Sequence, residues 1–111
     1  MIDWQRVSEL RDEIGSEDFD EVVDLFLQEV GSSLADLPSA AGDASALEPL
    51  LHFLKGSALN LGFKTLARLC QAGEFAAGAG NARDVDVGLI IQTFDDSRLE
   101  FLTELPLRMA A

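Results

Sequence analysis

The sequence predicts an all-α protein, an up-down antiparallel four-helix bundle with a short additional N-terminal helix. Apolar residues recur at spacings of three and four, which is the period of one helix face, and the chain has no Tyr and few β-branched residues that alternate with polar ones. With 111 residues and 48% hydrophobic content, the chain is long enough for one core and short for two. We therefore expect residues 1–111 to form a single domain.

Capping residues and a proline delimit the first two helices. Asp3 can cap a first helix that ends at Gly15, and its apolar positions are Trp4, Val7, Leu10 and Ile14. This short helix is expected to cover one end of the bundle. A longer helix opens at Ser16 and is expected to end at Pro38, with an apolar stripe of Phe19, Val22, Val23, Phe26, Val30, Leu34 and Leu37.

The third helix follows a predicted loop at residues 38–42. Asp43 or Ser45 can cap this helix, which is expected to run to about Leu61, and Ser45 with Glu48 fits a capping box. Pro49 removes one backbone donor, which is tolerated best near the first turn.

Two more amphipathic helices complete the bundle. After Gly62, a fourth helix carries Phe63, Leu66, Leu69, Cys70 and Gly73, and the segment at residues 78–81 closes it. A last helix, expected to end at Pro106, carries Val87, Ile90, Ile91, Phe94, Phe101, Leu102 and Leu105. Because every stripe must be buried and the connections are short, neighbouring helices are expected to be antiparallel.

Composition excludes several function classes. Twenty acidic against eight basic side chains give a formal charge of −12, and no basic stripe compensates locally, so we expect neither nucleic acid nor an anionic membrane surface as a partner. The absence of a signal peptide or a long apolar run predicts a cytoplasmic protein, and the initial Met favours a free-standing one. Cys70 is the only cysteine and His52 the only histidine, so no metal site of the Cys/His kind is expected and Cys70 is expected to be buried.

A helical wheel places His52 on the outward face of the third helix. At about 100° per residue, Leu47, Leu50, Leu51, Ser57, Ala58 and Leu61 fall within roughly 60° of Leu54 and form the buried face. His52, Gly56 and Leu59 fall on the opposite side, and Lys55 falls near the edge. The pattern combines a nucleophilic imidazole, space left by a glycine, a cation for an anionic group and an apolar rim for docking.

The residues from His52 to Gly62 resemble the signature of the histidine phosphotransfer family. His52, Leu54, Lys55, Gly56, Ser57 and Ala58 match H-x-L-K-G-S-[AS], and Asn60 and Gly62 follow; further matches are Asp43, Leu66, Leu69 and Glu74. The resemblance implies a four-helix bundle in which His52 accepts a phosphoryl group from an aspartyl phosphate and passes it to another aspartate. It also implies that Lys55 neutralises the phosphate, that Gly56 permits close docking, and that Glu74, where Gln is also common, orients the imidazole.

The resemblance further implies a phosphocarrier without its own ATP site. The glycines at residues 78–80 do not form a Walker loop, so no intrinsic cofactor is expected, and Mg²⁺ is expected from the partner. The implied partners are response-regulator receiver domains and a histidine kinase or hybrid kinase. We expect a monomer, docking through a face that includes Leu59, and phosphorylation at Nε2 of His52.

Three alternatives remain open at this point. The chain can be a helical docking module that binds a kinase or receiver without being phosphorylated, or an interaction domain with no phosphate chemistry. The third is a hydrolase with His52 as general base, which is disfavoured because Ser57 falls on the buried side of the same helix.

Overall fold

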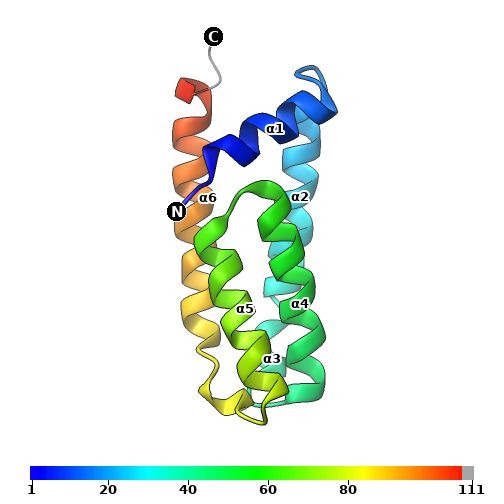
Figure 1. Ribbon diagram of the computed structural model, residues 1–111, viewed down its shortest axis with the longest axis vertical. Helices are drawn as coiled ribbons and strands as arrows, with labels where there is room; N and C mark the ends of the chain where they lie inside the picture. The colour runs from blue at the N-terminus through cyan, green and yellow to red at the C-terminus, as the bar shows by residue number, and fades with distance from the viewer. Residues whose placement is uncertain (109–111) are drawn as a thin grey trace.

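Four long helices run alternately up and down in the computed structural model, which describes residues 1–108 (Figure 1). The elements in chain order are α1 (Trp4–Ile14), α2 (Phe19–Leu34), α3 (Leu37–Ala40), α4 (Ala44–Leu61), α5 (Lys64–Gly78), the short 3₁₀ turn η1 (Ala82–Asp84) and α6 (Val87–Arg108). Residues 1–108 contain no β-strand. The prediction of an all-α, up-down bundle is confirmed.

Helix α1 lies across the end of the α4–α5 hairpin, where it was expected to cover the bundle (Figure 1). Asp3 caps it by accepting a hydrogen bond from the Arg6 backbone N–H at 3.2 Å, and Gly15 ends it with φ of 95°. Two bonds fasten α1 to the hairpin: the Asp3 backbone N–H donates to the Gly62 carbonyl at 2.7 Å, and Arg6 Nε donates to the Asn60 carbonyl at 3.1 Å. The helix end and the hairpin turn therefore stabilise each other.

The predicted end of the second helix at Pro38 is wrong, and so is the predicted loop at residues 38–42. Helix α2 ends at Leu34, and Pro38 lies in the first turn of the separate helix α3. A proline fits there because the first turn has no intrahelical partner for its missing N–H. The break turns the chain so that Leu37 and Ala40 are both buried.

Helix α4 begins at Asp43, and the predicted capping box of Ser45 with Glu48 does not form. Asp43 Oδ1 accepts from the Ser45 backbone N–H at 3.1 Å and from Ser45 Oγ at 2.8 Å, so Ser45 is a donor inside the helix. Pro49 lies within α4 without ending it. Its ring is exposed, so the helix loses one bond on the side that water reaches.

Pro106 does not end the last helix, because α6 continues to Arg108. Pro106 has no backbone N–H, so the Leu102 carbonyl loses its helical donor. Both residues are exposed, so water can reach that side of the helix. Arg108 holds the final turn by donating to Glu104 Oε1 at 3.3 Å and by lying 4.7 Å from the centre of the Trp4 ring.

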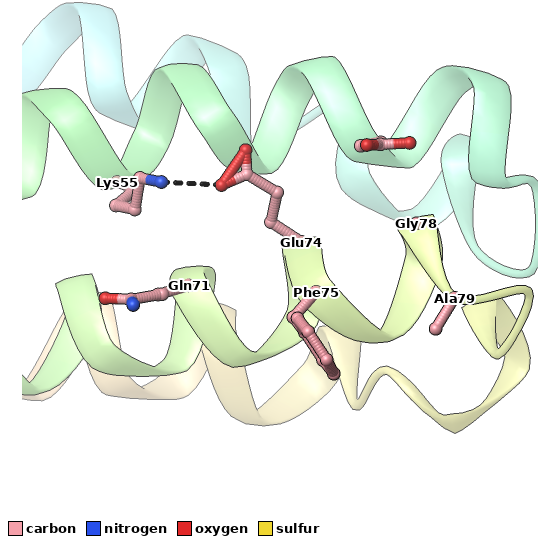
Figure 2. Close-up of a pocket in the computed structure, with 7 residues that line it drawn as sticks. Lys55, Gln71, Glu74, Phe75, Gly78 and Ala79 are labelled. Carbon is pink, nitrogen blue, oxygen red and sulfur yellow. Dashed lines mark hydrogen bonds and ion pairs between the residues drawn. The ribbon is translucent and has the colours of Figure 1, made fainter.

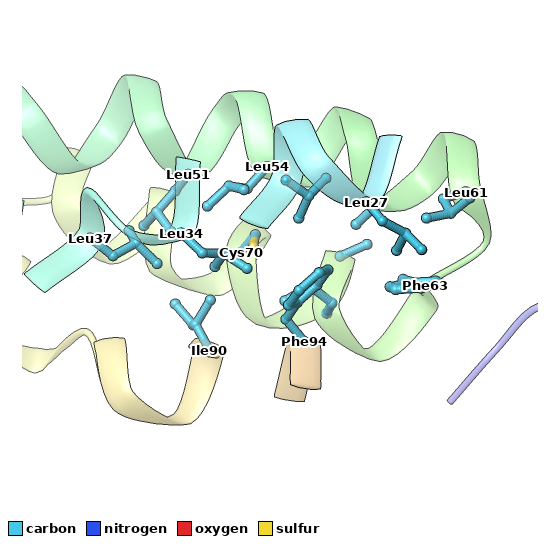
Figure 3. Packing of buried hydrophobic residues seen from close by; sticks show 14 of the residues in the cluster. Leu27, Leu34, Leu37, Leu51, Leu54, Leu61, Phe63, Cys70, Ile90 and Phe94 are labelled. Carbon is cyan, nitrogen blue, oxygen red and sulfur yellow. The ribbon is translucent and has the colours of Figure 1, made fainter. Parts of the chain in front are cut away.

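The core lies between the four long helices and is made largely of their predicted apolar stripes (Figure 3). Leu102, predicted on the last stripe, is 43% exposed, and the buried Leu27 was not predicted. Leu51, Leu54 and Leu61 of α4 face Cys70 of α5 and Phe94 of α6. Cys70 is fully buried, as predicted, and burial raises the pKa of its thiol to about 12. None of the helices formed by residues 1–108 has the length and apolar content to cross a membrane.

Replacing Gly62 by alanine is expected to destabilise the fold more than the same change at Gly80. Both glycines have left-handed φ values, 86° and 87°, so each variant loses about 1–2 kcal/mol from backbone strain. Only at Gly62 does an added Cβ also meet a neighbour, at 2.8 Å from the Asp3 carbonyl oxygen, whereas nothing lies within 4 Å at Gly80. Urea unfolding of both variants measures the difference, and equal losses of stability would contradict the docking of α1 on this turn.

Candidate functional site

Helix α4 turns one face to the core and the other to solvent, as the wheel predicts. Its buried residues are Leu47, Leu51, Leu54, Ser57, Ala58 and Leu61, with Leu50 half-buried. The side chain of His52 is 71% exposed, and Gly56 and Leu59 are exposed on the same side. Lys55 is 23% exposed at the edge of this face. The imidazole is therefore open to a partner.

Glu74 of α5 brings His52 and Lys55 together through its two carboxylate oxygens. Oε2 lies 2.6 Å from His52 Nδ1, and Oε1 accepts from Lys55 Nζ at 2.6 Å. The Glu74 side chain is only 18% exposed, so it lies beneath the imidazole and not in front of it. The sequence pairs Glu74 with His52 through the resemblance alone, and the structure places them in contact.

This contact determines the tautomer of His52. The pKa of Glu74 lies below its usual value. The largest cause is the hydrogen bond that Lys55 donates to it; desolvation opposes the shift, and the hydrogen bond from His52 adds to it. An ionised carboxylate can only accept, so the proton between the two groups belongs to Nδ1. In the neutral ring, Nε2 then carries the lone pair. The lone pair of the neutral ring therefore lies on the nitrogen that Glu74 does not contact.

Gly56 leaves open space one turn beyond His52. A Cβ built there meets no atom within 4 Å, so the packing of this chain does not require a glycine at that position. The glycine costs about 1 kcal/mol of helix propensity relative to alanine. Because Gly56 has no side chain, the helix surface beside the imidazole is open to the approach of a second molecule.

A hollow of about 510 Å³ adjoins this face between α4 and α5 (Figure 2). Its lining residues are Glu48, Lys55, Gln71, Glu74, Phe75, Gly78 and Ala79. Phe75 is 79% exposed at its rim, which is unusual for a large apolar side chain. The sequence analysis missed Phe75, although its place directly after Glu74 and off the apolar stripe of α5 was a usable signal.

The other residues of the resemblance have structural positions. Asp43 caps α4, Leu66 is buried, and Leu69 is half-buried against the core. Leu59 is 55% exposed on the face of His52, which fits the apolar docking rim expected there. Residues 1–108 hold no group of three or more His, Cys, Asp or Glu side chains arranged to bind a metal ion.

Comparisons with known proteins agree with this geometry. A family model described as Hpt domain matches residues 21–106. The crystal structure of histidine-containing phosphotransfer protein B (HptB) from Pseudomonas aeruginosa PAO1 is similar, with a TM-score of 0.81 and 27% sequence identity over 99% of this chain and 96% of that chain. The comparison with curated proteins gave no significant match.

Removing the Lys55 charge is expected to raise the pKa of Glu74. Lys55 is the largest cause of its depression from the ordinary value of 4.5, so Lys55→Met should shift the midpoint upward by more than His52→Gln does. Because the folded pKa is depressed, the ionised carboxylate stabilises the fold above its ordinary pKa, and this stabilisation is lost as the pH falls through the lowered value. Carbon-13 NMR titration of the Glu74 carboxyl measures both shifts. A midpoint that Lys55→Met leaves unchanged would contradict the ion pair.

Proposed function

The chain belongs to the Hpt domain family, and we propose that it is a phosphocarrier of a two-component phosphorelay whose phospho-accepting residue is His52. In this proposal His52 accepts a phosphoryl group from the aspartyl phosphate of a receiver domain or hybrid kinase and passes it to the aspartate of a response regulator. One observation carries the assignment: His52 is the only histidine, and Glu74 holds its Nδ1 at 2.6 Å while the side chain stays 71% exposed.

The proposed transfer is an in-line displacement at phosphorus. The lone pair on Nε2 forms the new N–P bond as the P–O bond to the partner's aspartate breaks, and the electron pair of that bond stays on the aspartate carboxylate. The proton on Nδ1 remains in place, so the phosphorylated ring is formally cationic and donates its hydrogen bond to Glu74. Return of the phosphoryl group to a second aspartate runs the same steps in reverse.

Lys55 and Gly56 have supporting parts in this proposal. Phosphoryl transfer depends on positioning and on neutralising the charge of the transferred group. Lys55 is the cation closest in the sequence to His52, and its Nζ binds the other oxygen of Glu74. The open space at Gly56 admits the partner's active site, and exposed Leu59 supplies an apolar contact at its rim.

The rest of the chemistry is assigned to the partner. The receiver domain contributes the aspartate, and Mg²⁺ is expected as part of its site and not as an intrinsic cofactor of this chain. The chain contains no Walker loop, so its phosphate must come from another protein. A hydrolase with a Ser57–His52 pair is not supported, because Ser57 is buried on the core face of α4.

Replacing His52 by glutamine is expected to abolish phosphorylation of the chain. Purified chain and variant are incubated with a receiver domain labelled on its aspartate, and acid-labile label is then measured on each. Glutamine keeps the polarity and exposure of the position but has no nucleophilic ring nitrogen, so the fold stays intact. Label that persists in His52→Gln, or that never appears on the natural chain with any competent receiver, would leave a docking module without phosphate chemistry as the better explanation.

Replacing Lys55 by alanine is expected to slow transfer about tenfold, the equivalent of a loss of about 1.4 kcal/mol of transition-state stabilisation. Stability should change by about 1 kcal/mol or less, because Lys55 and Glu74 are 23% and 18% exposed and an ion pair that water can still reach contributes little to folding. The matched control is Arg83→Ala, which removes one exposed cation from η1, away from the site. Single-turnover transfer and thermal unfolding separate the two effects, and a large loss of stability in Lys55→Ala would contradict its assigned place at the edge of the site.

A further inference from the structure

One stretch of the sequence around His52 is free of acidic residues. No Asp or Glu occurs between Glu48 and Glu74, although the chain has 20 of them in 111 residues. The same stretch contains three of the eight cationic side chains, Lys55, Lys64 and Arg68. It forms most of α4 and the first part of α5. Apart from Glu48, one turn before His52, and Glu74, which contacts His52, these two helix segments carry no carboxylate.

Lys64 and Arg68 lie on the solvent-facing side of α5, about 80° and 120° around the helix from Glu74. Their spacing to Gln71 and Phe75 follows one stripe of a helix, and those two residues line the hollow beside Lys55 and Glu74. Both cations are exposed, and neither makes a hydrogen bond or an ion pair with any of residues 1–108. We call Lys64 and Arg68 the cationic strip.

The cationic strip lies within reach of a molecule that docks on His52. At a rise of about 1.5 Å per residue, Arg68 is about 9 Å and Lys64 about 15 Å from Glu74 along the axis of α5. A protein interface of standard size covers about 800 Å² on each partner, equivalent to a disc of about 16 Å radius. A disc of this radius centred on Glu74 therefore reaches both cations along α5. Leu59, on the face of His52, is exposed as well.

The charge of the strip indicates what covers it. The proposed function, on which this inference rests, requires a partner that holds an aspartyl phosphate together with a divalent cation, and such cations are bound by carboxylates. The partner is thus acidic around its reacting group, and a chain of formal charge −12 is repelled from it at long range. Two unpaired cations near His52 reverse that repulsion locally. They are too few against this net charge to hold a nucleic acid backbone.

We propose that the cationic strip docks the acidic surface that surrounds the phosphoaspartate of a receiver domain and so sets the rate of productive encounter. Lys64 and Arg68 make no hydrogen bond or ion pair with His52, Lys55 or Glu74, so the strip acts on association and not on the chemical step. Association driven by charge depends on ionic strength, because salt screens exposed charges. Partners with a more acidic rim are then captured faster.

The test reverses the charge of the strip in the full chain. Lys64→Glu with Arg68→Glu is compared with Arg83→Glu with Arg98→Glu, which changes the net charge equally on other faces of the bundle. Transfer from a phosphorylated receiver domain is measured against receiver concentration at about 20 mM and about 300 mM salt. At low salt the strip variant should lose about tenfold or more in the second-order rate constant. Its rate at saturating receiver should be unchanged, and its deficit should shrink at high salt.

Three outcomes would overturn the proposal: an equal loss in the control pair, a loss confined to the saturating rate, or no loss. If the charge-reversed chain unfolds early in a thermal scan, Lys64→Ala with Arg68→Ala is used, and a smaller loss with the same salt dependence is expected. Equilibrium binding of the Mg²⁺-loaded, unphosphorylated receiver provides a second measurement. Weaker binding by the strip variant alone supports docking even when His52 takes up no phosphate, whereas equal binding by all variants refutes it.

Discussion

The site depends on how closely α5 approaches α4 at Gly73. A Cβ at this position would lie 2.9 Å from Leu51 Cδ1 and 3.2 Å from Val85 Cγ1, so the glycine lets the backbone of α5 pack on the leucine face of α4 without displacing either side chain. Glu74 follows at about 100° around the helix and emerges at the edge of this contact. Since the two helices are so close there, one glutamate side chain spans from α5 to both His52 and Lys55. A tightly packed core contact thus supports a polar contact on the surface directly above it.

The bridging carboxylate gives an exposed imidazole a fixed orientation. Exposed ion pairs are usually weak because two long side chains lose their freedom for a screened attraction. Here the two members that carry formal charge, Glu74 at 18% and Lys55 at 23% exposed, are mostly covered, and only His52 extends far into solvent. The two least exposed side chains, Glu74 and Lys55, therefore hold the geometry of the site. The ring keeps one nitrogen in a hydrogen bond and presents the other to an approaching partner.

Much of this arrangement follows from local sequence, and the rest depends on contacts between distant segments. The cap at Asp3, the cap at Asp43 and the outward placement of His52 depend on a few neighbouring residues, and all three were predictable. How the helices accommodate the prolines at positions 38, 49 and 106 was not predictable. A proline removes a backbone N–H, and each of these is tolerated because it lies at a helix start or where water can hydrogen-bond the carbonyl that loses its donor. The contact between Glu74 and His52 depends on how α5 packs on α4 near Gly73. No spacing rule links residues on two different helices, so in the sequence only the resemblance pairs these two residues.

The same limit explains why the charge pattern was overlooked. In the sequence, Lys55, Lys64 and Arg68 do not form a basic run, and the gap in the acidic residues crosses the turn at Gly62. Folding the chain back at that glycine places the end of α4 beside the start of α5, so a gap along the sequence becomes a gap on one surface. A charge profile taken along the sequence does not show which residues the turn at Gly62 brings side by side. The hairpin is what shows that the two halves of this stretch lie on neighbouring helices.

A phosphocarrier must hold its phosphoryl group and also release it, and the pairing of Lys55 with Glu74 bears on both. In the proposed carrier, Glu74 keeps Nδ1 protonated, so the phosphorylated ring departs as a neutral imidazole, which is a good leaving group. The same carboxylate repels the phosphoryl oxygens, and Lys55 on its other oxygen offsets that repulsion. Because the pair is neutral overall, the chain adds no strong net attraction that would trap the phosphoryl group on His52. The partner's site, with its own cation and aspartate, then decides the direction in which the group moves.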